Sequence, residues 1–555
     1  MANNVLKIHP SYWLTALAGA ILFMPFLGKA HLFDWDEINF AESSREMLAT
    51  GNYWITQINF EAFWEKPPLF FWLQAICMKI FGVNEMAARL PNAIAGILTL
   101  LVFNGIGRRH FNQQFATFWM LIYAGSLLPH FYFKSGIIDP WFNLFIFLTF
   151  YYLLGYENPE KSSTNAKKLL PLALAGLFAG LATLTKGPVA LLVTGLTVGV
   201  YYLLNFKQIT TKKIAGYLFF SLVALLVGSL WFIALWLTGQ SHVIEEFMVY
   251  QIRLFTTEDA DHGGFTGYHF VVILIGCFPA SVLLILSMFR GNSLPSPNPF
   301  QALFKKWMLI LFWVVIILFT IVKTKIVHYS SLCYFPLSFL AAWVMSAHYD
   351  KPKTLPVWMM VLQGIIGFAL CLALVLLPWI DVLKTSIFPY MDDPFAIESF
   401  KADGNWKWWD SSPAFFIVAG MVLWFRQCQN LTKAFTYLLL CCALSFNLAI
   451  MLIVPNVERY SQRANIEFFK WCAANNYVAE TWGYKSYGQL FYANRPPAFK
   501  GYKIDKIKDK IITPERPVYV SVKIHRVTDF KAWSPASKLL YTKHGFAFFE
   551  FKHAE

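Results

Sequence analysis

Long apolar runs recur through most of this chain, and they restrict its fold more than any other feature of the sequence. A run of about 20 apolar residues can cross the hydrocarbon core of a bilayer as a helix. The first clear run is "YWLTALAGAILFMPFLG", and similar runs follow as far as residue 454. Hydrophobic residues make up 57% of the chain and charged residues 14%. The sequence therefore predicts an α-helical membrane protein that crosses the bilayer many times.

The apolar runs predict about thirteen transmembrane helices. We place them at residues 11–29, 88–107, 115–130, 141–155, 169–184, 188–204, 214–237, 269–289, 307–322, 330–347, 356–379, 412–425 and 434–454. No small-residue cleavage site follows the first run, so we interpret it as a span and not as a signal peptide. Residues 1–454 then form the membrane part of the chain, with a long first loop at 30–87.

The last hundred residues differ in composition from the rest. Residues 455–555 are mixed polar and contain alternating runs such as "RPVYVSVKIHR" and "FAFFEF", which are typical of strands. Their single cysteine is Cys472, and most of the others lie within the apolar runs, so no disulfide framework is expected. We predict a small α/β domain here.

The basic residues indicate how the chain is oriented in the membrane. The net charge is +14, but the lysines and arginines are scattered between the apolar runs, which argues against a nucleic-acid partner. They gather in alternate loops: Arg108, Arg109, Lys161, Lys167, Lys168, Lys207, Lys212, Lys213, Arg290, Lys305, Lys306, Lys351, Lys353, Arg426 and Lys433. Cytoplasmic loops carry such an excess. We therefore predict a cytoplasmic N-terminus and place the first loop and the C-terminal domain outside, in the periplasm.

Carboxylates concentrate in the first outer loop, in "FDWDEINFAESSREMLATGNYW" and "FEAFWEKPPLFFW". The first stretch predicts a helix that Asp34 or Asp36 caps and that Gly51 ends. Glu42 and Arg45 are three residues apart, so we predict that they form an ion pair on one face of this helix. One interpretation is an ordinary charged loop in contact with water; the other is a catalytic site.

Polar residues in the other outer loops favour the catalytic interpretation. Charges close to the hydrocarbon are costly unless they line a cavity or meet a partner. Several cations that face a few carboxylates suit the handling of a lipid phosphate. The candidates are Asp139, Lys186, Lys323, Lys325 and Tyr329.

These residues lie in motifs that resemble those of a known enzyme family. The motifs are "WDEINFAESSREMLATGNYW", "FEAFWEKPPLFFW", "AARLPNAIAG", "IIDPWFNLF", "LTKGPVALL", "RLFTTEDADHGGFTGYHF" and "KTKIVHYSSLCYFPL", in this order over roughly residues 30–340. The chain resembles GT-C glycosyltransferases of the lipid A aminoarabinose transferase type, which are related to protein O-mannosyltransferases (glycosyltransferase family 83-like). This resemblance implies a GT-C fold and a sugar donor carried on a polyprenyl phosphate.

The resemblance also implies roles for individual residues. Asp36 resembles the catalytic aspartate of the first outer loop, with Glu37 and Asp139 as further candidate catalytic carboxylates. Lys66 resembles the lysine that contacts the donor phosphate. Further contacts to this phosphate are expected from Lys186, Lys323, Lys325 and Tyr329.

A metal site is the last implication of the resemblance. Glu65 and His262 resemble a pair that can bind a divalent metal, zinc or magnesium. The sequence departs from the family where Asp-Glu-x-Arg-Tyr is common, because Asn39 and Phe40 occupy the last two positions. An arginine that could face phosphate is thus missing from this motif.

The residue types suit glycosyl transfer with inversion at the anomeric carbon. Lysines can stabilise the charge on a departing lipid phosphate, and Asp36 can take a proton from an acceptor hydroxyl. The expected acceptor is lipid A, another envelope glycolipid or a protein, at the outer face of the bacterial inner membrane, and the enzyme is expected to act as a monomer. The alternative is a transporter or flippase for lipid-linked sugars, but the charges cluster at one face and not at mid-span.

Overall fold

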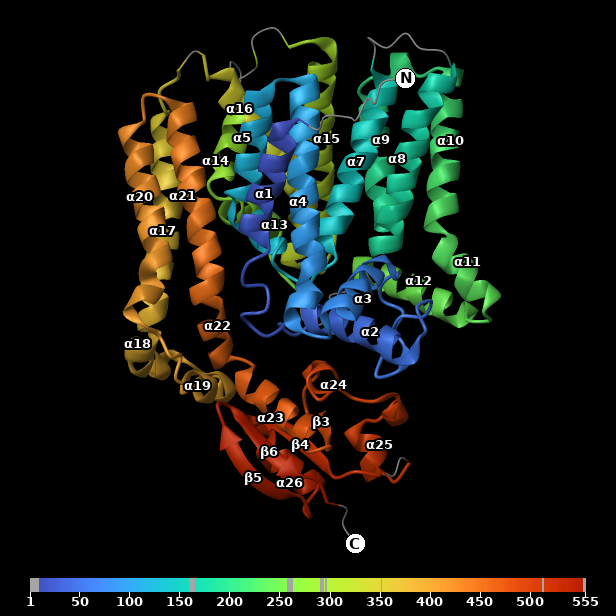
Figure 1. The fold of residues 1–555 in the computed structure, drawn as a ribbon, viewed down its shortest axis with the longest axis vertical. Helices are drawn as coiled ribbons and strands as arrows, with labels where there is room; N and C mark the ends of the chain where they lie inside the picture. Colours follow the sequence, from blue (N-terminus) through green and yellow to red (C-terminus); the bar gives the residue numbers. More distant parts are fainter. Residues whose placement is uncertain are drawn as a thin grey trace.

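The computed structural model describes residues 9–158, 165–256, 263–289, 294, 297–350, 352–511 and 514–552. Helices that run roughly parallel form a bundle, and a small sheet domain, the tail, lies beyond one end of it (Figure 1). A layer of short helices lies between bundle and tail. The first described residues, which lead into the first helix, lie at the end of the bundle opposite the tail (Figure 1).

The bundle contains the long helices of the chain. They are α1 (Pro10–Phe23), α4 (Glu85–His110), α5 (Gln113–Ala124), α7 (Asp139–Glu157), α8 (Asn165–Lys186), α9 (Val189–Leu203), α10 (Thr211–Gly228), α15 (Pro299–Ile321), α16 (Tyr334–Ala347), α17 (Val357–Leu376), α20 (Ser412–Arg426) and α21 (Leu431–Leu452). Further helices join them: α6 (Leu127–Tyr132), α11 (Leu230–Leu237), α12 (Ser241–Thr256), α13 (Tyr268–Gly276), α14 (Ala280–Ser287), the 3-10 helix η2 (Val327–Cys333), α18 (Ile380–Ile387) and α19 (Pro394–Phe400).

Helices occupy each of the stretches that the sequence predicts to cross the membrane. Within the described ranges, seven helices are long and apolar enough to cross a bilayer, or up to eight if a bent pair counts as one span. Helices α1 and α9 are apolar but shorter. The many-span membrane class is therefore supported, and the number thirteen stays a prediction.

One predicted span is sharply bent. The stretch 269–289 is divided into α13 and α14, whose axes differ by 116°. Pro279 precedes α14, and its ring nitrogen has no hydrogen to donate, so it cannot continue α13. The stretch is a broken span or a re-entrant loop.

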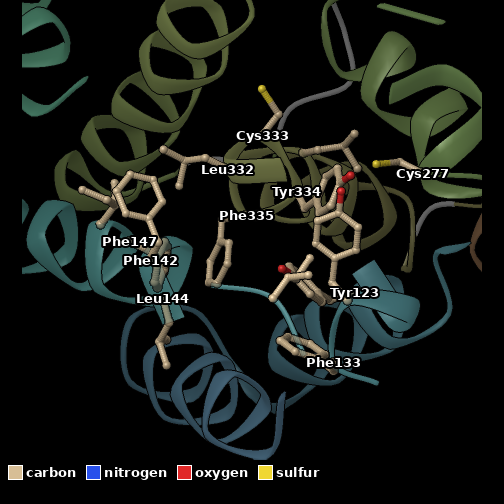
Figure 2. Packing of buried hydrophobic residues seen from close by; sticks show 14 of the residues in the cluster. Tyr123, Phe133, Phe142, Leu144, Phe147, Cys277, Leu332, Cys333, Tyr334 and Phe335 are labelled. Atoms are coloured by element: carbon tan, nitrogen blue, oxygen red, sulfur yellow. The ribbon is translucent and has the colours of Figure 1, made fainter. Parts of the chain in front are cut away.

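Aromatic side chains fill the core of the bundle. Phe103 of α4 stacks on Trp119 of α5 with ring centres 4.2 Å apart. Phe335 of α16 lies between Phe147 of α7 and Tyr123 of α5 (Figure 2), at 5.1 and 5.2 Å between ring centres. Buried rings in such edge and offset contacts stabilise the packing beyond their buried area. This packing fixes α7 and α16, and with them the adjoining loops at the end of the bundle that faces the tail.

The first outer loop forms most of the layer between bundle and tail. It contains α2 (Asp36–Thr50), the two-residue strands β1 (Gln57–Ile58) and β2 (Glu61–Ala62), and α3 (Leu69–Phe81). Gly51 ends α2 in the left-handed conformation with φ of 71°, as predicted. The predicted side-chain cap is wrong, because Trp35 occupies the N-cap position without a capping bond. Asp34 is engaged by the tail, where it accepts hydrogen bonds from the Ser486 hydroxyl and, at 3.3 Å, from the Tyr487 N–H.

The tail contains a four-stranded mixed sheet in the order β3-β4-β6-β5. Its strands are β3 (Val478–Trp482), β4 (Val518–Lys523), β5 (Lys538–Lys543) and β6 (Phe546–Glu550), and its helices include α22 (Val454–Val457), α23 (Arg463–Ala474), α24 (Gly488–Phe491), α25 (Ile504–Lys508) and α26 (Val527–Trp533). β3 runs parallel to β4, with Val478 opposite Val518, and the other pairs are antiparallel. The predicted mixture of strands and helices is thus present.

The tail is attached to the first outer loop by hydrogen bonds. The Tyr492 hydroxyl accepts from the Leu32 N–H at 2.7 Å, and the Gly501 N–H donates to the Asn59 carbonyl at 2.9 Å. The tail therefore lies directly against the loop that carries the candidate catalytic residues.

Candidate active site

A cavity of about 760 Å³ lies at the tail side of the bundle, among α2, α6, η2 and the tail. Its polar lining includes Asp34, Asp36, Glu37, Glu65, Arg89, Lys134, Arg253, His328 and Lys485. A narrower pocket of about 130 Å³ adjoins it and is lined by Lys66, Asp139, Lys186 and Tyr329, among others. Asp36, Glu65 and His328 line both compartments. Tyr250 and Ile326 line both as well, so the two compartments meet at these five residues.

Asp36 is a half-exposed carboxylate at this junction. Its side chain is 45% exposed, and its Oδ2 lies 3.8 Å from Nε2 of His328. His328 is held in turn by the Tyr132 hydroxyl, 2.9 Å from its Nδ1. A carboxylate that keeps its accessible oxygen beside a histidine can accept a proton from a bound substrate.

Glu37 is placed differently, although it is the next residue. Its carboxylate accepts two hydrogen bonds from Arg89, at 2.9 and 2.8 Å, and further bonds from the N–H groups of Phe33 and Gly136, at 3.0 and 2.6 Å. Burial alone would raise the pKa of Glu37, but the Arg89 guanidinium and these bonds hold it below its ordinary value. Both oxygens are fully used by the protein, so a direct catalytic role for Glu37 is not supported.

Arg89 joins this carboxylate to the start of the first outer loop. It donates to the carbonyl oxygens of Leu27 and Ala30, at 2.8 Å each, and of His31, at 2.9 Å. The motif "AARLPNAIAG" contains Arg89, but its pairing with Glu37 spans 52 positions of the sequence and no local spacing indicates it. Arg89 and Arg253 both line the cavity, but the Arg89 guanidinium is already used by Glu37 and these carbonyls, so Arg89 does not replace the arginine that is missing at Asn39.

Asp139, the third predicted carboxylate, is also paired. It begins α7, it is buried, and its Oδ1 accepts from Lys186 Nζ at 2.6 Å and from the Ser331 hydroxyl at 3.2 Å. Lys186 ends α8 and also lies over the Tyr329 ring, 5.8 Å from its centre. The charge of Lys186 is therefore largely neutralised within the narrow pocket.

The predicted phosphate-binding lysines are separated by the structure. Lys66 lines the narrow pocket, and its Nζ lies 5.1 Å from the centre of the Tyr250 ring. Lys325, predicted as a phosphate ligand, donates to the carbonyls of Phe319, Thr320 and Val322 at the end of α15, at 3.1, 2.7 and 2.5 Å. Its ammonium satisfies carbonyls that have no partner within the helix. Lys323 is exposed and lines neither compartment, so no contact in the structure supports its predicted role.

The predicted ion pair of α2 is confirmed and is buried. Arg45 donates to both oxygens of Glu42 at 2.7 Å, and its Nη1 reaches the Asn494 side chain of the tail at 3.2 Å. Burial raises the pKa of the neighbouring Glu46 to about 9, and the Glu42 carboxylate acts in the same direction. This cluster connects α2 to the tail and does not line either compartment.

Of the two predicted metal ligands, the structure describes only Glu65. Glu65 lines both compartments and accepts a hydrogen bond from the Tyr250 hydroxyl at 3.3 Å, whereas His262 lies outside the described residues. Among the residues that the structure does describe, no three His, Cys, Asp or Glu side chains group as metal ligands. The metal therefore stays a prediction.

Comparison with known proteins identifies the fold around these compartments. The family described as dolichyl-phosphate-mannose-protein mannosyltransferase matches residues 65–233. The structure of ArnT from Cupriavidus metallidurans bound to undecaprenyl phosphate superimposes with a TM-score of 0.76, at 17% identity, over 97% of this chain and 98% of that one. The chain has the fold of ArnT. The resemblance read from the sequence motifs is confirmed.

Sequence relatives agree with the ArnT fold. The undecaprenyl phosphate-alpha-4-amino-4-deoxy-L-arabinose arabinosyl transferase of Pectobacterium carotovorum subsp. carotovorum is 27% identical over 346 residues, which are 62% of this chain and 60% of that protein. The enzyme of the same name from Shewanella sediminis is 28% identical over 363 residues, 64% of this chain and 62% of that protein. The chain thus spans about three fifths of the length of the curated relatives it matches.

Proposed function

We propose that this protein transfers a sugar from a polyprenyl phosphate to an acceptor of the cell envelope. The observation that carries the proposal is the placement of Asp36. It lies where the wide cavity and the narrow pocket meet, and it is half-exposed, while Glu37 and Asp139 are held by Arg89 and Lys186. The ArnT fold and the names of the relatives support an enzyme over the flippase alternative.

The two compartments suit the two substrates of such a reaction. The narrow pocket has an apolar lining with Lys66 in it, which suits the phosphate and first isoprenoid units of the donor. The wide cavity, where Arg253 and Lys134 contribute positive charge, suits the acceptor. The donor sugar then lies between them, beside Asp36.

The transfer is a single displacement. An oxygen of the acceptor attacks the anomeric carbon from the face opposite the phosphate, the bond to the phosphate oxygen breaks, and the configuration inverts. Lys66 stabilises the negative charge on the leaving phosphate. Asp36 takes the proton if the acceptor is a hydroxyl, and it orients the sugar if the acceptor is itself a phosphate. Lipid A, another envelope glycolipid or a protein fits as acceptor, and the sugar is a pentose or a hexose.

The proposal also sets the orientation in the inner membrane. We place the N-terminus in the cytoplasm and the tail in the periplasm, because basic residues such as Arg108, Lys207 and Lys306 lie at the end opposite the tail. There the Lys306 ammonium reaches Asn205 at 2.6 Å. A reporter fused behind the tail should be active only outside the cytoplasm, and activity inside the cytoplasm would contradict this orientation. We propose that the enzyme acts as a monomer.

Reconstituted transfer tests the function. Purified protein in lipid vesicles is given undecaprenyl phosphate linked to 4-amino-4-deoxy-L-arabinose or to mannose, with lipid A as acceptor, and release of undecaprenyl phosphate is measured. Asp36→Asn should reduce the rate by about a hundredfold or more, the scale for loss of an acid–base group. Asp392→Asn, which changes an exposed carboxylate elsewhere, serves as the control. A folded Asp36→Asn protein with the parent rate would contradict the assignment.

A further inference from the structure

A second hollow lies between the tail and the first outer loop, outside the two compartments already described. Its volume is about 620 Å³. Its walls come from the end of β3 and the loop that follows, from α24, from the start of α25, and from the turn between β1 and β2. The transfer mechanism uses none of these segments.

A buried network gives this hollow a fixed wall. Arg495 donates to Glu480 at 2.5 Å, to the Asn59 side chain at 2.9 Å and to the Ala479 carbonyl at 2.6 Å. Asn59 in turn donates to the Tyr502 carbonyl at 2.8 Å. Because these groups are buried and hydrogen-bonded to one another, they hold the tail and the loop in a single geometry.

The lining of the hollow carries a surplus of positive charge. Lys503 and Arg526 are exposed side chains of the lining, and neither has an ion-pair partner within the described chain. Among its carboxylates, Glu480 is paired with Arg495 and Glu61 lies 3.6 Å from Lys506. Asp505 is then the one lining carboxylate without an ion-pair partner among the described residues. Two available cations against one acid favour an anionic ligand.

An unsatisfied amide points to the same conclusion. Gln489 lines the hollow and is only 8% exposed, yet its Oε1 has no hydrogen-bond partner among the described residues. A buried polar atom without a partner costs free energy unless a ligand or water satisfies it. Trp482 and Tyr484 stand in the same lining, and aromatic rings beside amides and cations are suited to contact with a sugar.

Lys485 connects this hollow to the active-site cavity. It lines both of them, and its Nζ lies 4.5 Å from the centre of the ring of Trp35, the residue before Asp36. A ligand large enough to fill the hollow can therefore extend past Lys485 toward the cavity.

We propose that this hollow binds an anionic saccharide part of the acceptor, bearing phosphate or carboxylate groups, while the reacting group enters the cavity at Asp36. This inference rests on the proposed function, because it describes the chemistry of the acceptor in that reaction. Lys503 and Arg526 bind the anionic groups of this saccharide. The tail is then a part of acceptor recognition.

Direct binding to the full-length protein tests this site without any catalysis. Calorimetry in detergent compares three probes: a glucosamine disaccharide that carries two phosphates, the same disaccharide without phosphate, and inorganic phosphate. The phosphorylated disaccharide should bind most tightly. Lys503→Ala with Arg526→Ala should weaken it by about tenfold or more, whereas Lys531→Ala with Lys538→Ala, which removes two exposed charges elsewhere on the tail, should leave it unchanged. If inorganic phosphate binds as tightly as the phosphorylated disaccharide, the hollow is not a saccharide-binding site.

Transfer kinetics separate this inference from the proposed function. In the double variant, KM for a phosphorylated acceptor should rise while kcat and KM for the donor stay as in the parent. Gln489→Glu, which adds a negative charge inside the hollow, should act in the same direction if the double variant fails to fold. If the parent transfers sugar and the folded double variant has the same KM for the acceptor, the proposed acceptor site in the hollow is wrong. The proposed function would still hold. If the disaccharide binds in a way that depends on Lys503 and Arg526 but the parent transfers no sugar, the binding site in the hollow is supported and the proposed glycosyl transfer is contradicted.

Discussion

At the scale of single residues, Lys66 is the lysine that the structure leaves available for the donor phosphate. It lines the narrow pocket, and within the described chain no carboxylate forms an ion pair with it. Lys186 in the same pocket is paired with Asp139. We expect Lys66→Ala to lower kcat/KM for the donor by about 10- to 100-fold, since a hydrogen bond to a charged group contributes roughly 1.5–3 kcal/mol. Steady-state rates at limiting donor measure this.

Lys323 gives a matched control for that experiment. It is also a lysine of an outer loop, but it is exposed and lines neither compartment. Lys323→Ala should therefore keep the parent kcat/KM. Equal losses in the two variants would mean that general positive charge, and not a contact of Lys66, governs donor use.

How far the sequence predicts these residues depends on the distance between partners along the chain. Glu42 and Arg45 are neighbours on one helix face, and their predicted pair is present. The pairs Glu37–Arg89 and Asp139–Lys186 join separate helices. The sequence therefore indicated that these charged residues could be functional, but it could not predict which residue pairs with which. For Lys325, the sequence could not reveal that the chain folds back on the end of α15, where its ammonium meets backbone carbonyls.

At the scale of elements, the pair of Glu37 and Arg89 fixes the start of α2 against α4. Removing one partner of a buried pair leaves the other charge unpaired, which costs about 3–5 kcal/mol. We expect Glu37→Gln to lose roughly this much free energy of unfolding, measured by denaturant or thermal melts in detergent.

The surface pair Glu398–Lys401 is the control for that loss. Both side chains are about half-exposed, so Glu398→Gln should cost less than about 1 kcal/mol. A Glu37→Gln protein that is as stable as the parent but inactive would instead make Glu37 a catalytic residue.

Helix α2 also contains a carboxyl group that should make stability depend on pH. Burial raises the pKa of Glu46 from 4.5 to about 9 in the folded protein. The folded state thus holds this proton more tightly than the unfolded chain, and stability falls as pH rises from about 4.5 to about 9. The free energy of unfolding should decrease by at most about 1.4 kcal/mol for each pH unit in this window. Thermal melts across this range measure the slope.

Glu46→Gln isolates this contribution. The amide keeps the shape of the side chain and can still accept from the Phe60 N–H, which lies 2.8 Å from Glu46 Oε2. The variant should melt at a higher temperature than the parent at pH 8 and at a similar temperature near pH 5. An unchanged pH slope in the variant would show that Glu46 is not the responsible group.

At the scale of the whole molecule, the sequence predicted the architecture better than its details. Apolar length indicated the helices of the bundle because crossing a bilayer demands such runs. The same criterion could not reveal the 116° bend between α13 and α14, since apolar length says nothing about direction. The hollow between tail and first outer loop was also hidden, because its two sides lie more than four hundred residues apart in the chain.

The central claim is that the protein adds a sugar to an envelope acceptor through Asp36. The most direct measurement is a mass spectrum of lipid A and the other envelope glycans from cells with the gene, cells without it, and cells that carry Asp36→Asn. It needs no prior choice of sugar or acceptor. The account predicts a species heavier by one pentose or hexose derivative that disappears both on deletion and in the Asp36→Asn cells. Identical spectra in all three, or a full return of that species with stable Asp36→Asn protein, would contradict it.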